Sequence, residues 1–424
     1  MRKKEAAQLL LAALSAFCVY TCMYAFRKPF TAANFSSLSF AGIDYKVWLV
    51  ITQTIGYTLS KFYGIRFIGE LKKEQRTAAI LGFIGVAWLA LLFFAIIPSP
   101  YNILFLLLNG FPLGVIYGLV FSYLEGRRST ELLGAVLASS FIFASGFTQS
   151  VGKTILLRWH ISEWWMPFVT GAVFVLPTLL FTGLLSLTPK PTKEDMAMRT
   201  NRVPMNKEQR RRFIQTFLPG LSLLVAAYIL LTIIRDYRSN FASNIWAELG
   251  ANNSAAIFTQ TEIPASVITL VLLGLLVLVK NNFKALWINH LIVGGGFLLC
   301  IAVTWLFTQK MVNPFWWMTG VGIGLYMAYV PFNAMLFERL IASFHTAGNA
   351  GFLIYLADSF GYLGSDVVLL AKNFLRLTIS WSDFFVLLLF SFSVVGVLLT
   401  TASALYFRNK YSLHQQKQAA VSYG

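Results

Sequence analysis

The sequence predicts an all-α membrane protein in which twelve transmembrane helices form two six-helix bundles. Of its 424 residues, 57% are hydrophobic and 12% are charged, which is about half the charged fraction of soluble domains. Apolar stretches of about 20 residues, long enough to cross a bilayer as a helix, recur along the chain. One long polar segment, residues 188–212, separates six such stretches from six more.

Hydropathy places short polar loops between the apolar stretches. We expect spans at residues 7–34, 44–66, 77–97, 101–124, 132–157, 163–187, 210–240, 254–280, 285–309, 314–342, 347–372 and 381–407. The predicted domains are a first bundle at 1–187, a basic cytoplasmic linker at 188–212, and a second bundle with a short cytoplasmic tail at 213–424. This division is typical of transporters whose halves are related by an axis along the membrane normal.

The distribution of positive charge predicts the orientation of the chain. If the N-terminus is cytoplasmic, the tails and the loops on that side hold 23 of the 34 Lys and Arg residues, as the positive-inside rule requires. The first apolar stretch is long and is not followed by a clear small-residue cleavage site, so we expect it to be retained. We therefore predict an integral protein of a bacterial inner membrane with both termini in the cytoplasm.

The sequence argues against an enzyme, a cofactor site or nucleic-acid binding. The net charge of +17 is spread over short loops rather than along an amphipathic helix. Cys18, Cys22 and Cys300 lie within predicted spans and lack zinc-site spacing. The phosphate loop Gly-x-x-x-x-Gly-Lys-Ser/Thr is absent, which argues against an ATP-driven pump. We expect a monomer, surrounded by lipid, whose partner is a small anionic solute.

Candidate substrate ligands begin near the end of the first span. Tyr20, Tyr24 and Arg27 are spaced at i, i+4 and i+7, so on a helix they share one face. A guanidinium beside two phenols suits a carboxylate or a phosphate. Arg235 has the corresponding place in the seventh span, and in a two-half transporter both helices face the central cavity. Two arginines could then grip one anion; alternatively, each extends to the outer interface.

Other polar side chains also fall within predicted spans. Tyr57 and Lys61 lie one turn apart in the second span, where the lysine either serves as another cavity cation or extends to the cytoplasmic interface. Tyr326 in the tenth span and Tyr362 in the eleventh either pack or line the cavity.

Two carboxylates within predicted spans are candidates for ion pairing or proton coupling, as intramembrane carboxylates usually are. Glu262 lies in the eighth span and Asp358 in the eleventh. We expect Glu262 to pair with an arginine, and Asp358 is a candidate proton carrier.

These residues resemble a known pattern. The chain is similar to the major facilitator superfamily and, within it, to the family of organophosphate–inorganic phosphate antiporters. The matching positions are Tyr20, Tyr24 and Arg27 in span 1, Tyr57 and Lys61 in span 2, Arg235 in span 7, Glu262 in span 8, Tyr326 in span 10 and Tyr362 in span 11. The resemblance implies the major facilitator fold, alternating access and phosphate bound by Arg27 and Arg235.

Three departures from that pattern indicate a divergent branch. The histidine that the family has in span 5 is missing from residues 139–146. Thr232 replaces the tyrosine one turn before the second arginine. The loop after span 2 lacks the Asp of a Gly-x-x-x-Asp-Arg type motif, unless Glu70 substitutes for it. The substrate can therefore differ from those of the family.

The sequence thus predicts a secondary transporter that moves a small organic or phosphorylated anion by alternating access. Two alternatives stay open. The first is a proton-coupled symporter of another small solute, with Asp358 or Glu262 as the proton carrier. The second is a sensor that keeps the fold and binds the anion without transporting it.

Overall fold

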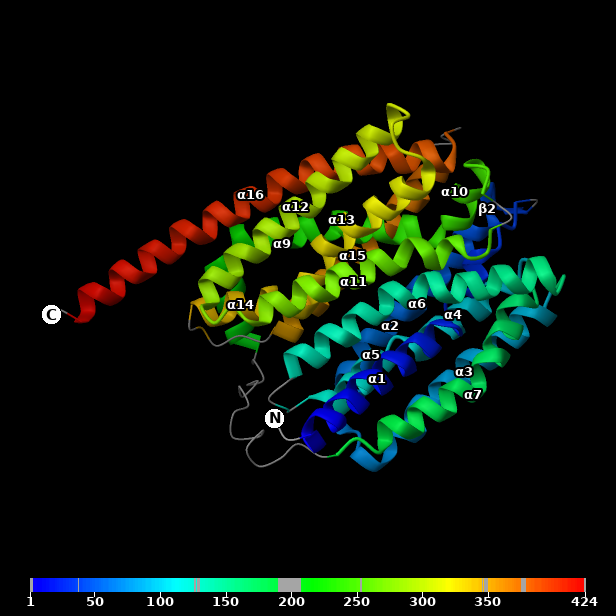
Figure 1. The fold of residues 1–424 in the computed structure, drawn as a ribbon, viewed down its shortest axis with the longest axis horizontal. Helices are drawn as coiled ribbons and strands as arrows, with labels where there is room; N and C mark the ends of the chain where they lie inside the picture. Colours follow the sequence, from blue (N-terminus) through cyan, green and yellow to red (C-terminus); the bar gives the residue numbers. More distant parts are fainter. Residues whose placement is uncertain are drawn as a thin grey trace. The chain divides into compact units, whose positions relative to one another are not determined.

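The structure is a computed structural model, and it describes residues 3–36, 38–125, 127, 130–189, 207–251, 254–344, 346, 350–374 and 379–422. These residues are almost entirely helical (Figure 1). Long apolar helices are expected of a chain in lipid, because a helix satisfies its own backbone hydrogen bonds. The predicted all-helical fold class is confirmed.

The first half of the chain contains seven helices. They are α1 (Lys3–Tyr24), α2 (Tyr45–Glu70), α3 (Arg76–Ile96), α4 (Ile103–Leu113), α5 (Ile116–Leu124), α6 (Thr130–Arg158) and α7 (Met166–Ser186). The short 3-10 helix η1 (Pro29–Ala32) and the antiparallel strands β1 (Ser39–Phe40) and β2 (Ile43–Asp44) connect α1 to α2. A second 3-10 turn, η2 (Lys73–Gln75), precedes α3.

The second half contains eight helices in its described residues. They are α9 (Lys207–Asn240), α10 (Ala242–Glu248), α11 (Ile257–Val277), α12 (Asn282–Thr308), α13 (Pro314–Ala334), α14 (Leu336–Ser343), α15 (Ala350–Phe374) and α16 (Trp381–Ser422). The last of these, red in Figure 1, continues as one helix well past the predicted limit of the twelfth span at 407.

The helices have the dimensions of membrane spans. Within the described residues, ten segments are long and apolar enough to cross a membrane, and α13 with α14, bent by 50°, makes an eleventh. Helix α2 has 26 residues and is therefore about 39 Å long at ~1.5 Å per residue. Each of the twelve predicted spans thus has a helical counterpart, and the chain is an integral membrane protein.

Contacts divide the chain into two compact units. Unit 1 contains Met1–Arg199, Asp236–Val267 and Asp366–Phe384, and unit 2 contains Thr200–Arg235, Ile268–Ser365 and Phe385–Gly424. Unit 1 therefore includes, besides the first six spans, the C-terminal turn of α9, all of α10 and the first half of α11. The predicted domain boundary in the linker at 188–212 stays a prediction, because residues 190–206 lie outside the described residues.

The first helix ends ten residues before the predicted limit of the first span, which was placed at residue 34. After Tyr24 the chain turns, and the N–H groups of Arg27 and Lys28 donate to Tyr24 O at 3.0 and 2.8 Å. Pro29 has no N–H to donate to a helix, and it begins the short 3-10 helix η1. Arg27 therefore lies in the turn after α1, so the prediction that it shares a helix face with Tyr20 and Tyr24 was wrong.

Candidate functional site

Five of the predicted site residues lie together in unit 1, and we call them the Arg27 cluster: Tyr20, Tyr24, Arg27, Tyr57 and Lys61. The guanidinium carbon of Arg27 is 3.7 Å from the centroid of the Tyr57 ring and 5.8 Å from that of Tyr24. Lys61 Nζ is 5.3 Å from the Tyr57 centroid. The rings of Tyr20 and Tyr24 meet edge to face, with centroids 5.5 Å apart. The cluster thus gathers two cations and three phenols, although the helical spacing that predicted it was wrong for Arg27.

The Arg27 cluster is enclosed by protein. Arg27 is only 8% exposed, which does not agree with the alternative in which it extends to the outer interface. Lys61 is half-buried. A cation among buried aromatic rings is stabilised by their π-faces, and more strongly when water is excluded.

Two buried amides hold the turn that carries Arg27. Gln53 Nε2 donates to Arg27 O at 2.8 Å and to Asn109 Oδ1 at 2.7 Å. Asn109 Nδ2 donates to Phe26 O at 2.9 Å. Carbonyl groups just past a helix end have no helical partner. The amides on α2 and α4 supply those partners and fix the backbone from which Arg27 projects.

Tyr57 is held in place by direct backbone contact between α2 and α4. A Cβ atom at Gly110 would lie 2.2 Å from Gln53 O, and one at Gly114 would lie 2.6 Å from Tyr57 O. Only glycine permits helices to approach this closely. The position of the Tyr57 ring against Arg27 therefore depends on Gly110 in α4 and on Gly114 directly after it.

A second group, which we call the Arg235 cluster, lies in unit 2 and consists of Tyr228, Arg235, Tyr329, Asp358 and Tyr362. Arg235 Nη1 donates to Tyr329 Oη, and the guanidinium carbon is 4.4 Å from the Tyr329 centroid and 5.4 Å from that of Tyr362. The Tyr228 hydroxyl lies 2.7 Å from the Tyr329 hydroxyl and is hydrogen-bonded to Asp358 Oδ1. Two stacked phenols thus connect Arg235 to Asp358.

Helices α9 and α15 approach closely beside this cluster. A Cβ atom at Gly361 would lie 2.7 Å from Thr232 Oγ1, and one at Gly364 would lie 2.8 Å from a methyl group of Ile229. Thr232 is buried against Gly361, and its small side chain permits this close approach of the two helices.

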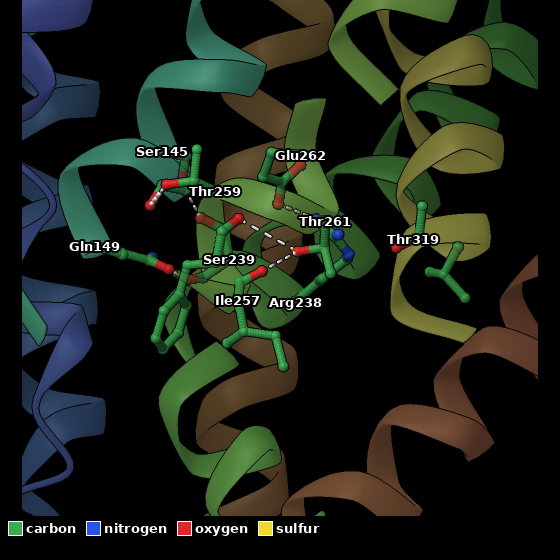
Figure 2. Close-up of polar contacts among 12 residues, drawn as sticks. Ser145, Gln149, Arg238, Ser239, Ile257, Thr259, Thr261, Glu262 and Thr319 are labelled. Carbon is green, nitrogen blue, oxygen red and sulfur yellow. Dashed lines mark hydrogen bonds and ion pairs between the residues drawn. The ribbon is translucent and has the colours of Figure 1, made fainter. Parts of the chain in front are cut away.

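The remaining predicted residues are Tyr326 and Glu262. Tyr326 is buried on α13, three residues before Tyr329. Glu262, on α11 in unit 1, accepts from Arg238 Nη1 at 2.5 Å (Figure 2). Both side chains of this ion pair are buried, with 2% of Arg238 and 9% of Glu262 exposed. The sequence analysis did not single out Arg238, although it lies one turn after Arg235.

The end of α9 carries further polar contacts within unit 1. Lys28 Nζ donates to Ser239 Oγ at 3.0 Å and to Asn240 Oδ1 at 2.5 Å. Ser239 Oγ lies 2.9 Å from Ser145 Oγ, and Gln149 Nε2 donates to Ser239 O at 2.7 Å (Figure 2). The turn after α1, helix α6 and the end of α9 are therefore joined by hydrogen bonds that sequence reasoning missed.

Lys46, in the first turn of α2, is also buried, with 1% of its surface exposed. Its Nζ donates to Thr31 O at 2.8 Å, Ala33 O at 2.7 Å and Asn244 Oδ1 at 2.7 Å. An ammonium group has three N–H donors, so these acceptors use all of them. Lys46 thus stabilises the segment between α1 and α2 and its contact with α10.

Helices α6 and α11 touch at Gly146, where an added Cβ would lie 2.3 Å from Phe258 O and 2.6 Å from Glu262 Cγ. We expect Gly146→Ala to separate the helices and to destabilise the protein by about 1–3 kcal/mol. The matched control is Gly183→Ala on α7, where no atom lies within 4 Å of the added Cβ. Thermal melting in detergent should show a lower midpoint for Gly146→Ala alone, and equal midpoints would contradict this packing.

Among the described residues, no group of three or more His, Cys, Asp or Glu side chains is arranged to hold a metal ion. The charged groups that the described helices bring together include cations among phenols and the buried Arg238–Glu262 pair. A cation among phenols suits the binding of an anion.

The fold is the major facilitator fold, as a comparison with solved structures shows. A solved structure titled "Crystal structure of D-xylose-proton symporter" matches with a TM-score of 0.61 and 16% sequence identity, over 93% of this chain and 96% of that chain. At this identity the likeness establishes the fold. The chain belongs to the family described as "Family of unknown function (DUF5690)", which matches residues 29–410. No curated protein matches the chain significantly.

Proposed function

We propose that this chain is a secondary transporter that moves a small organic or phosphorylated anion by alternating access, with Arg27 and Arg235 as its charged ligands. The observation that carries the proposal is the recurrence of one arrangement in both units. Each unit holds a guanidinium surrounded by phenol rings at the end of, or within, the first span of its half.

The chemistry of these clusters favours an oxyanion. A guanidinium presents a planar set of N–H donors that matches two oxygens of a phosphate or carboxylate. Phenol hydroxyls add neutral donors, and Lys61 adds a second positive charge near Arg27. Holding a guanidinium group within the membrane costs free energy. An anionic solute offsets this cost by an ionic interaction, and a neutral solute does not. Tyr20, Tyr24, Tyr57, Tyr326 and Tyr362 complete the proposed set of substrate contacts.

Phosphate-bearing compounds are the preferred substrate class, since the positions of Arg27 and Arg235 resemble those of organophosphate–phosphate antiporters. Exchange of phosphate for an organophosphate is the corresponding reaction. A bacterial inner membrane, cytoplasmic termini and a monomeric state belong to the same proposal.

Proton-coupled symport is the second candidate function. Two observations favour it: a solved structure with the same fold is titled as a D-xylose-proton symporter, and Asp358 is hydrogen-bonded within the Arg235 cluster. A sensor that binds the same anion without transporting it would share the two clusters, and measurement of flux distinguishes it from a transporter.

Ligand binding to the purified protein in detergent tests the substrate class. Inorganic phosphate, succinate and D-xylose are added separately, and the midpoint of thermal unfolding is recorded. A ligand present at about 100 times its Kd stabilises the folded state by about 2.7 kcal/mol. We expect phosphate or succinate to raise the midpoint and D-xylose to leave it unchanged. Stabilisation by D-xylose but by neither anion would contradict the proposal.

The Tyr57 ring provides a sharper test of the Arg27 cluster. We expect Tyr57→Leu to weaken phosphate binding because it removes the ring that lies 3.7 Å from the Arg27 guanidinium. A desolvated cation–π contact is worth up to about 2 kcal/mol, or about 30-fold in Kd. Tyr57→Phe keeps the ring and is the matched control. Equal loss in both variants would assign the effect to the hydroxyl group instead.

A further inference from the structure

We infer that one end of unit 2 binds the phosphate head group of an anionic phospholipid in the adjoining bilayer leaflet. The site is a surface formed by the start of α9, the start of α12 and the end of α16. We call it the basic face, and it consists of Arg211, Arg212, Lys284, Arg408 and Lys410. The inference goes beyond the proposed function and does not depend on it, because none of these residues belongs to the Arg27 cluster or the Arg235 cluster.

The end of α16 is joined to both of the other helix ends. Lys410 Nζ donates to Thr216 O of α9 and lies 5.0 Å from the centroid of the Phe217 ring. The ring of Tyr411 stacks on that of Phe283 at the start of α12, with centroids 3.8 Å apart. The basic side chains of the three helices therefore belong to one continuous surface.

This surface has a large excess of positive charge. Segments 208–218, 282–291 and 405–416 contain six Lys and Arg residues and one acidic residue, Glu208. Glu208 pairs with Arg212, but both side chains are mostly exposed, so the pair contributes little stability. Arg212 lies one turn before Thr216, which Lys410 contacts, so cations from two helices are neighbours. An anion from outside these segments would offset the excess charge.

Spacing along the helices places these cations at the level of lipid head groups. On each helix, an exposed leucine shares the face of an exposed cation, at a spacing of three or seven residues. The pairs are Arg211 and Leu218 on α9, Lys284 and Leu291 on α12, and Arg408 and Leu405 on α16. Exposed leucines of a membrane helix contact acyl chains, and seven residues of helix span about 10 Å. The cations therefore lie just beyond the apolar surface of unit 2.

The combination of cations and leucines favours a lipid over a soluble anion. A guanidinium group binds two oxygens of a phosphate, and an ammonium group adds a point charge. Each lysine or arginine beside an anionic bilayer contributes about five-fold in affinity. The acyl chains of the same lipid can contact the leucines, whereas inorganic phosphate offers only the contacts of the head group. Inorganic phosphate should therefore bind the basic face much more weakly than phosphatidylglycerol does.

Lipid binding by the full-length chain, purified in an uncharged detergent, tests the inference. Phosphatidylglycerol or phosphatidylcholine is added over a range of concentrations, and native mass spectrometry measures the bound lipid. We expect the wild type to prefer phosphatidylglycerol and to bind it less tightly as salt is raised from about 0.05 to 0.5 M. The triple substitution Arg211→Gln, Lys284→Gln and Arg408→Gln should weaken the binding of phosphatidylglycerol about 100-fold.

The matched control removes three exposed cations outside the basic face, by Lys72→Gln, Arg158→Gln and Lys310→Gln. It changes the net charge equally and should keep the affinity for phosphatidylglycerol. Equal losses in the two triple variants, or equal affinity of the wild type for both lipids, would overturn the inference.

Two further results would also overturn the inference. Displacement of phosphatidylglycerol by inorganic phosphate at the same concentration would assign the basic face to a soluble anion. Absence of phosphatidylglycerol binding would leave the face to a soluble acidic partner. If the basic-face variant did not fold, the salt dependence of the wild type would decide, and binding that salt does not weaken would refute a site made of cations. Because every readout is lipid binding, failure of anion transport would not affect the result.

Discussion

Arg27→Lys and Arg235→Lys are each expected to reduce the rate of phosphate exchange by about 10- to 100-fold. Lysine keeps the positive charge but lacks the planar set of donors that contacts two oxygens of an anion. Hydrogen bonds to charged groups contribute about 1.5–3 kcal/mol, which corresponds to this range. Initial rates of counterflow, normalised to the amount of protein in the vesicles, measure the effect.

Arg158→Lys is the matched control for these substitutions, because Arg158 is exposed at the end of α6. Exchange that both cluster variants retain would show that neither arginine is a ligand. A loss confined to one of them would leave a single cluster as the anion site.

Glu262→Leu is expected to be among the most destabilising single substitutions in the chain. It leaves the buried guanidinium of Arg238 without the carboxylate that lies 2.5 Å from it. Breaking one side of a buried ion pair typically costs about 3–5 kcal/mol. A large decrease in the thermal midpoint in detergent, together with poor yield of folded protein, is the expected result.

Two further substitutions distinguish the effect of breaking a buried ion pair from the effect of removing any charged side chain. The double substitution Arg238→Met with Glu262→Leu should recover much of the stability, because apolar side chains often replace a buried ion pair without loss. The Arg212–Glu208 pair has the same 2.5 Å separation, but its side chains are 76% and 70% exposed. We expect Glu208→Leu to change stability by less than about 1 kcal/mol. Equal losses for both glutamate substitutions would contradict this account.

The helical fold could be predicted from hydropathy because lipid leaves few alternatives for the backbone. Every predicted span has a helix in the structure. The errors lie at the ends of spans and at two internal breaks, between α4 and α5 and between α13 and α14. Helix α1 ends at Tyr24, ten residues before the predicted limit, and the apolar residues that follow it concealed this break. At the other end of the chain, α16 continues into polar sequence that hydropathy excludes from a span.

The site could be predicted only in part. Spacing along one segment indicated Tyr20, Tyr24 and Arg27, and the structure brings Tyr57 and Lys61 to the same cluster. Tyr228 was missed, although its position seven residues before Arg235 on one helix was a usable signal.

Buried cations were the larger omission. The sequence analysis did not single out Lys28, Lys46 or Arg238, which the structure shows to be buried. Their acceptors are distant in sequence: Asn240 is 212 residues from Lys28, and Asn244 is 198 residues from Lys46. Hydrogen bonds between residues so distant in sequence depend on tertiary packing. No periodic pattern in a single sequence indicates them.

The most direct test of the central claim is counterflow of labelled phosphate by the wild-type protein in proteoliposomes loaded with unlabelled phosphate. Our account predicts rapid entry of label that depends on internal phosphate and is absent from empty vesicles. D-xylose in both compartments should not support entry of labelled D-xylose. Sugar counterflow without anion counterflow would contradict anion transport, and phosphate binding without any flux would identify the chain as a sensor.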